Sequence, residues 1–145
     1  MPLIVSWPGK IKPGINRHLI TANWDFLPTA CEILKIKSPK KIDGISYLPT
    51  LLGEGNKQKK HDFLYWEFPQ YGGQQAVRMG KWKGIRMNIL KGNMKIQLYD
   101  LDNDILEQND KASQYPEIVK RIEEIMKKEH HTPDVDSFRM EALEK

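Results

Sequence analysis

The stretch 62–88 constrains the fold of this chain most, because glycine turns divide it into three segments with the pattern of β-strands. These segments span residues 62–68, 74–79 and 82–87. Pro69 and the pair Gly72-Gly73 interrupt the pattern after the first segment, since proline cannot donate to a strand ladder and glycine tolerates positive φ. Gly80-Lys81 supplies a compact turn before the third segment. The stretch therefore predicts an antiparallel meander.

The residues after the meander predict a fourth strand and a helix that covers the sheet. Residues 95–101 again have the strand pattern, and Pro116 suits the first position of a helix. An apolar stripe at helical spacing follows, formed by Ile118, Val119, Ile122, Ile125 and Met126. The periodicity ends at residue 130, so we expect 130–145 to be a surface-crossing or frayed tail.

The first sixty residues have a different pattern. Residues 3–5 are a short apolar run, which we interpret as a buried strand at the end of a larger sheet whose other strands are missing. A helix is expected from residue 21 or 23 to Leu34, with Leu27, Ala30, Cys31 and Leu34 packed on that sheet. Residues 47–52 suit one helical turn. We therefore predict a truncated α/β domain at 1–55, a linker at 56–61, an antiparallel sheet plus helix at 62–129, and a tail at 130–145.

Composition and charge limit the classes of protein to which this chain can belong. The mean hydropathy of -0.61 and the lack of an apolar run near twenty residues argue against a membrane-spanning helix, and the first residues lack a signal-peptide pattern. The net charge of +4 divides into a basic body and an acidic last third, which raises the hypothesis of nucleic-acid binding. The lysines lie in two connecting segments, however, which favours solvated loops, so we expect no nucleic-acid partner.

No complete catalytic or metal site is expected. Asp100, Asp102, Asp104 and Glu107 resemble the start of a calcium loop, but a glycine and a final acidic residue are missing, which favours a carboxylate-rich turn. Each of the four histidines, His18, His61, His130 and His131, is expected on the surface or in a loop. Cys31 lies among apolar residues, where cysteine behaves as a small buried hydrophobe.

A ligand-binding rim is one interpretation of the first hairpin. We expect its members to be Trp66, Glu67, Gln74, Gln75 and Arg78. Aromatic, amide and guanidinium groups suit hydroxyl-rich or anionic ligands, because rings stack on sugars and arginine binds oxyanions. The alternative is an internal cross-strand ion pair between Glu67 and Arg78.

The order of several modest motifs resembles the C-terminal part of a type I sulfatase, of the arylsulfatase family in the alkaline-phosphatase-like superfamily. The similarity covers roughly residues 2–125, and its motifs are PLIVSWPGKIKPG, WDFLPT, DGISYLPTLLGEG, FLYWEF, QAVRMGKWKGIR, LYDLDND and EQND. The resemblance implies an α/β fold, in which the end of a large alkaline-phosphatase-like sheet precedes a four-stranded antiparallel sheet covered by a C-terminal helix.

The resemblance also implies a reaction and its cofactors. The family hydrolyses sulfate esters with a formylglycine, made from Cys or Ser in a C-x-P-x-R motif, and a calcium ion. Cys31 does not match that motif, and the family has an Asp-Pro pair where this chain has Asp104-Ile105. We therefore expect no catalytic or metal-binding residue in this chain, and no turnover by it alone.

The partners implied by the resemblance belong to a longer parent. They are the missing N-terminal sulfatase domain and a sulfated small molecule or glycan. The parent is expected to be periplasmic or secreted, and calcium and formylglycine would belong to it. The alternative hypothesis is a non-catalytic anion- or glycan-binding module.

Overall fold

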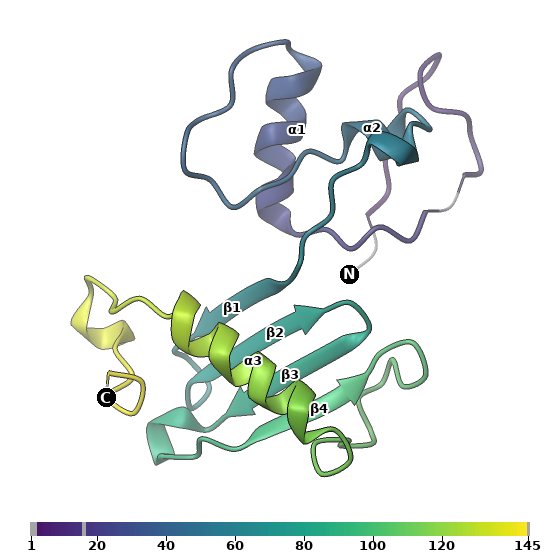
Figure 1. Ribbon diagram of the computed structural model, residues 1–145. Helices are drawn as coiled ribbons and strands as arrows, with labels where there is room; N and C mark the ends of the chain where they lie inside the picture. Colours follow the sequence, from purple (N-terminus) through teal and green to yellow (C-terminus); the bar gives the residue numbers. More distant parts are fainter. Residues whose placement is uncertain (1–2, 16, 145) are drawn as a thin grey trace. The chain divides into compact units, whose positions relative to one another are not determined.

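A computed structural model describes residues 3–15 and 17–144. The chain forms two compact units, residues 1–61 and 62–145, which are described separately. The N-terminal unit contains a 3-10 helix at Asn23–Asp25, α1 at Phe26–Ile33, α2 at Leu48–Leu51 and a 3-10 helix at Gly55–Lys57 (Figure 1). Among the described residues, no helix is long and apolar enough to cross a membrane.

Two buried polar side chains hold the N-terminal unit together. The Asp25 carboxylate is 1% exposed, accepts a hydrogen bond from the backbone N–H of Ile45 (2.8 Å), and lies 2.8 Å from His61 Nε2. Thr29 Oγ1 accepts a bond from the backbone N–H of Tyr47 (3.0 Å). These bonds tie the start of α1 to the segments that follow it. His61 lies in a loop, as predicted, although only 11% of its side chain is exposed.

The buried strand predicted at residues 3–5 is absent from the structure. The segment has no strand conformation, and the side chains of Leu3 and Ile4 are 58% and 91% exposed. The physical reason is that a strand needs a hydrogen-bonded neighbour, and the described residues of the N-terminal unit contain no strand.

The predicted first helix is confirmed, but its apolar stripe is not the buried face. Cys31 is buried at 7% exposure, as predicted, together with Pro28 and Thr29. Leu27 and Leu34 are 48% and 67% exposed. One side of α1 therefore presents apolar side chains to solvent within this unit.

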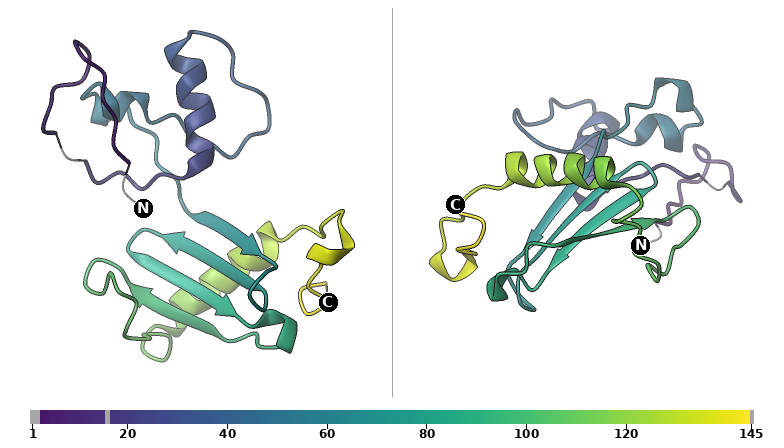
Figure 2. Two further views of the ribbon diagram at one scale, coloured as in Figure 1. Left: turned by 180° about the vertical axis from the view of Figure 1, so that it is seen from behind. Right: turned by 60° about the horizontal axis from the view of Figure 1, so that its bottom comes forward.

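The C-terminal unit contains the predicted sheet. Its elements are β1 at Leu64–Phe68, β2 at Gln74–Met79, β3 at Trp82–Met87, β4 at Ile96–Asp100 and α3 at Pro116–Glu129, with 3-10 helices at Ile89–Lys91 and Asp136–Phe138. The strands pair antiparallel in the order β1-β2-β3-β4, and α3 lies across one face of the sheet (Figure 2). The mixed α/β fold class is confirmed.

The core of this unit lies between α3 and the sheet. Val77, Leu98, Ile122 and Met126 are fully buried there. Gly84 in β3 permits this packing, because a Cβ at that position would lie 2.7 Å from Ile122 Cγ2. The glycine therefore lets α3 approach the sheet closely.

The acidic stretch after β4 forms the predicted turn. The Asp104 carboxylate accepts bonds from the backbone N–H groups of Gln108 (3.1 Å) and Asn109 (2.8 Å). These bonds hold the pKa of the Asp104 carboxyl below its ordinary value. The Asp104 carboxylate therefore serves local backbone groups, as the sequence indicated, whereas the Glu107 carboxylate pairs with Lys83 of β3.

Candidate functional site

A cluster of polar side chains lies on the helix-covered face of the sheet, near the C-terminal end of α3. Its members, which we call the Glu67 cluster, are Tyr65, Glu67, Gln75, Arg86 and His130. The register pairs Glu67 with Gln75 and Gln75 with Arg86, so these three side chains share one face. Tyr65 lies two residues before Glu67 and therefore shares that face. His130 follows the last residue of α3.

Glu67 is held from three directions. The Tyr65 hydroxyl donates to Glu67 Oε2. Gln75 Nε2 donates to Glu67 Oε2 at 3.2 Å and to the Tyr65 hydroxyl at 2.9 Å. His130 Nδ1 lies 3.0 Å from Glu67 Oε2. The carboxylate is therefore fixed within the unit by its own neighbours.

Arg86 forms the buried end of the cluster, at 2% exposure. Its Nη1 donates to Gln75 Oε1 and its Nε to the Met94 carbonyl, both at 2.9 Å. Its Nη2 lies 3.5 Å from a carboxylate oxygen of Glu123 in α3. Arg86 therefore links the sheet to both α3 and the segment before β4.

Burial governs the titration of the cluster. Burial lowers the pKa of the Arg86 guanidinium, against the opposing effect of the Glu123 carboxylate. Burial also raises the pKa of the Tyr65 hydroxyl, and its hydrogen bond to Glu67 raises that pKa further. Tyr65 is therefore a neutral donor over the ordinary pH range.

The structure separates the predicted rim residues into two groups. Glu67 and Gln75 lie on the helix-covered face, and Gln75 is 1% exposed. Trp66, Gln74 and Arg78 lie on the opposite face, because side chains alternate along a strand. Among the predicted rim residues, Glu67 and Gln75 are joined by the hydrogen bond from Gln75 Nε2 to Glu67 Oε2.

The predicted Glu67–Arg78 ion pair is wrong. Arg78 pairs in register with Leu64 and lies on the other face from Glu67. Its Nε donates to the Gly80 carbonyl at 2.6 Å, at the hairpin between β2 and β3. Arg78 is also four residues along β2 from Gln74, a separation of about 13 Å at strand geometry.

The loop between β1 and β2, residues 69–73, lies beside exposed rings. Phe68 and Tyr71 stack with ring centroids 6.0 Å apart, and Tyr71 is 83% exposed. Trp66 and Met87, on the open face of the sheet, are 40% and 38% exposed. This end of the sheet offers an aromatic surface that suits the face of a sugar ring.

The predicted rim omitted three members of the Glu67 cluster, namely Tyr65, Arg86 and His130. Alternation along residues 82–87 places Arg86 on the same face as Trp82 and Gly84, and that signal could have marked it as buried. No sequence signal marked His130, which was predicted to be a surface or loop residue. It lies in the loop after α3, as predicted, although its side chain is only 12% exposed.

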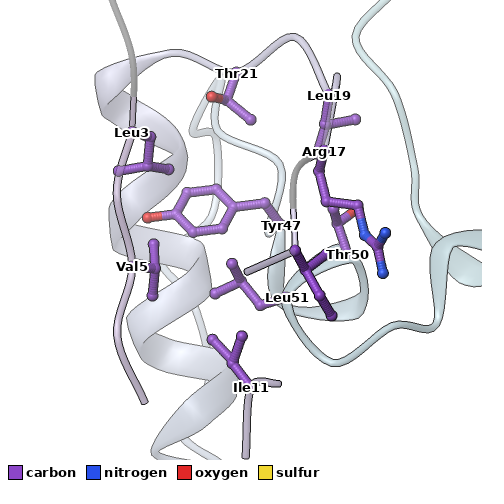
Figure 3. A pocket seen from close by; sticks show the side chains of 10 residues that line it. Leu3, Val5, Ile11, Arg17, Leu19, Thr21, Tyr47, Thr50 and Leu51 are labelled. Atoms are coloured by element: carbon purple, nitrogen blue, oxygen red, sulfur yellow. The ribbon is translucent and has the colours of Figure 1, made fainter. Parts of the chain in front are cut away.

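A separate pocket of about 280 Å³ lies within the N-terminal unit. Figure 3 shows the Tyr47 ring among apolar side chains, with Arg17 nearby. Burial raises the pKa of the Tyr47 hydroxyl, and the Asp25 carboxylate adds to that rise. The apolar lining comprises Leu3, Val5, Ile11, Ile15, Leu19 and Leu51. The rest of the described lining is polar and comprises Arg17, Thr21, Tyr47 and Thr50. This lining includes no carboxylate or histidine that could act in an acid–base pair.

The described residues do not fit the calcium ion or the formylglycine that the family implies. They contain no group of three or more His, Cys, Asp or Glu side chains placed to hold a metal. Cys31 is buried in α1 and is followed by Glu32, outside the C-x-P-x-R motif. The described residues of this chain therefore hold neither group.

Comparison with protein families identifies a match over most of the chain. The family described as "N-sulphoglucosamine sulphohydrolase, C-terminal" matches residues 1–132. This range includes β1, β2, β3, β4 and α3. The match extends across both compact units.

Curated relatives are also sulfatases. The chain is 36% identical over 84 residues to arylsulfatase A of Bos taurus, covering 57% of this chain and 16% of that protein. It is 29% identical over 139 residues to an N-acetylgalactosamine-6-O-sulfatase of Bacteroides thetaiotaomicron, covering 87% of this chain and 26% of that protein. The chain thus spans about a quarter or less of the length of these relatives.

Solved structures share the fold. A 2-O GAG sulfatase superposes with a TM-score of 0.61 at 31% identity, over 72% of this chain and 23% of that chain. A protein in complex with its substrate D-glucosamine-2-N,6-O-disulfate superposes with a TM-score of 0.68 at 22% identity, over 84% of this chain and 26% of that chain. The second likeness concerns the fold alone. With the family match, these similarities show that the chain belongs to the sulfatase family and corresponds to its C-terminal part.

Proposed function

We propose that this chain is the C-terminal part of a sulfatase that hydrolyses sulfate esters of sugars, and that it contributes structure without a catalytic centre of its own. Relatives over most of its length include N-acetylgalactosamine-6-O-sulfatase and N-acetylglucosamine-6-O-sulfatase, whose names specify sulfated sugars. The observation that carries the proposal is the family match at residues 1–132. The alternative of an independent glycan-binding module is not favoured by these matches.

Exposed apolar side chains of the N-terminal unit support a larger parent. Ile4, Phe26 and Leu34 are 91%, 67% and 67% exposed. Several such side chains within one small unit favour burial against further protein, because exposed apolar area is unfavourable in water. The proposed cover is the remainder of the α/β sulfatase domain, to which residues 1–55 would belong.

The C-terminal unit would supply one wall of the substrate pocket. Trp66 and Gln74 are placed on the open face of the sheet, where they are accessible to a sugar. Glu67 and Gln75 lie behind that face, and their mutual bond supports the strands next to the 69–73 loop. In this proposal Trp66 and Gln74 contact the ligand, Glu67 and Gln75 hold the wall, and Arg78 contributes only from the far end of β2.

The cofactors of the parent would come from the part of the protein that this chain lacks. When bound there, formylglycine supplies the nucleophile and calcium stabilises the charge of the sulfate group. The residues of this chain would only orient the sugar and exclude water from one side. The Glu67 cluster would hold the wall in place, because its internal hydrogen bonds fix its position whether or not a ligand is bound.

The coding DNA upstream of residue 1 tests this proposal. We expect a sulfatase-like reading that includes a C-x-P-x-R motif, either in frame or in a shifted frame. An upstream region without any such reading would contradict the parentage. The test is independent of whether the isolated chain folds or binds sugars.

A further inference from the structure

We propose that residues 130–144 form a strap that holds the 69–73 loop at the end of the sheet, with His130 and Met140 as positioning residues. The strap belongs wholly to the C-terminal unit. Figure 1 shows the chain after α3 folding back beside the sheet end that carries this loop. Any effect of the strap on substrate binding rests on the proposed function, in which the loop forms part of a pocket wall. The existence of the strap does not rest on that proposal.

Met140 anchors the middle of the strap. Its side chain is 1% exposed, although Arg139 and Glu141 on either side are exposed. It packs beside Gly73, where a Cβ would lie only 2.7 Å from Met140 Sδ. Gly73 also has a φ of +77°, a conformation that favours glycine. The loop is therefore shaped to receive the Met140 side chain.

The loop that Met140 covers is joined to the 3-10 helix at Ile89–Lys91. The backbone N–H groups of Ile89 and Leu90 donate to the carbonyls of Gly73 (3.2 Å) and Gly72 (3.0 Å). A Cβ on Gly73 would also lie 3.2 Å from Leu90 Cγ. Met140 thus packs against the site where the 69–73 loop is hydrogen-bonded to this 3-10 helix.

His130 anchors the start of the strap to the Glu67 cluster. Its Nδ1 lies 3.0 Å from Glu67 Oε2, and its Nε2 lies 3.6 Å from Glu144 Oε1. Thr132 Oγ1 donates to Glu144 Oε2 at 2.5 Å. The end of the strap therefore returns to its own beginning, and Glu67 joins the strap to β1.

The segment between the anchors is weakly held. Val135 and Phe138 are 50% and 48% exposed, and the contact of Arg139 with Asp136 (3.2 Å) is local and largely solvent-accessible. Segments with few buried contacts open at low free energy without unfolding the core. Release of Met140 and His130 would therefore free the loop while the sheet and α3 stay folded.

Hydrogen exchange of the full chain, followed by NMR, tests the strap. Met140→Ala is expected to accelerate exchange of the Ile89 and Leu90 amides at least about tenfold, with less than about twofold change at Val77 in β2. Met94→Ala, which alters a methionine that is 39% exposed, is the matched control and should change none of these amides. Unchanged Ile89 and Leu90 amides in Met140→Ala, or equal acceleration at Val77, would overturn the proposal.

A second variant keeps the test decisive if Met140→Ala does not fold. His130→Ala is expected to accelerate exchange of the same loop amides at least about threefold, whereas His131→Ala, at the exposed neighbouring position, should not. Equal effects of the two histidine variants would overturn the role of His130. These measurements need no substrate, so their result is independent of the proposed sulfatase parentage.

Discussion

Replacing Arg86 with methionine is the sharpest test of the Glu67 cluster. Methionine keeps much of the length and apolar volume of the side chain, so the change removes mainly the guanidinium group. Arg86 is 2% exposed and donates to Gln75 Oε1 and to the Met94 carbonyl, both at 2.9 Å. The variant leaves both acceptors without this donor.

The expected loss follows from these contacts. Leaving the buried Gln75 Oε1 without a donor costs about 1–3 kcal/mol, and loss of the bond to the carbonyl of Met94, a residue that is 39% exposed, costs about 1 kcal/mol. The contact with Glu123 contributes little, because its N···O distance is 3.5 Å and the Glu123 side chain is 41% exposed. The expected decrease in the free energy of unfolding of the C-terminal unit is therefore about 2–4 kcal/mol for Arg86→Met.

Native-state hydrogen exchange at the β2 amides measures this free energy within the C-terminal unit alone. Arg121→Met is the matched control, since Arg121 lies on the exposed side of α3 and should change the free energy by less than about 0.5 kcal/mol. A decrease below about 1 kcal/mol in Arg86→Met would refute the reasoning that the buried donor is needed.

Three further perturbations follow from the packing and from the shifted pKa values. Gly84→Ala should destabilise the C-terminal unit by about 1–3 kcal/mol in thermal or urea unfolding, because the new Cβ would lie 2.7 Å from Ile122 Cγ2; no loss would contradict the close approach of α3. Since the pKa of Tyr65 is raised, its stabilising effect is complete below about pH 10 and is lost as the pH rises further. Tyr65→Phe should therefore show a weaker loss of stability between about pH 10 and 12 than the unmodified chain. The pKa of Asp104 is lowered, so its contribution to stability is present above about pH 4 and is lost in acid. The stability difference between the unmodified chain and Asp104→Asn should therefore shrink from about pH 6 to pH 3. A constant difference would contradict the hydrogen bonds of the Asp104 turn.

Local pattern was sufficient for much of the C-terminal unit. Alternating side chains, the glycine turns and the apolar stripe after Pro116 predicted four strands and a covering helix, because each signal depends on nearby residues. The carboxylate-rich turn was also predictable, since Asp104 caps backbone groups only a few residues away. The fold class follows from such short-range information.

Features that depend on distant partners were not predictable in the same way. The apolar run at residues 3–5 has the composition of a strand, but a strand forms only beside another. The alternative of a cross-strand ion pair between Glu67 and Arg78 failed because it depends on the register. The register places Gln75 opposite Glu67, and the end of α3 brings His130 to it. Met140 lies in a segment without periodicity, so its burial depends on the shape of the Gly73 loop.

The central claim is that this chain is the C-terminal part of a sulfatase without a catalytic centre of its own, and sulfate release by the full chain tests it most directly. The purified chain would be incubated with an aryl sulfate and calcium, beside bovine arylsulfatase A as a positive control. A chain without a catalytic centre is expected to release no sulfate above the buffer level at any concentration. A rate of sulfate release proportional to the concentration of this chain would contradict it.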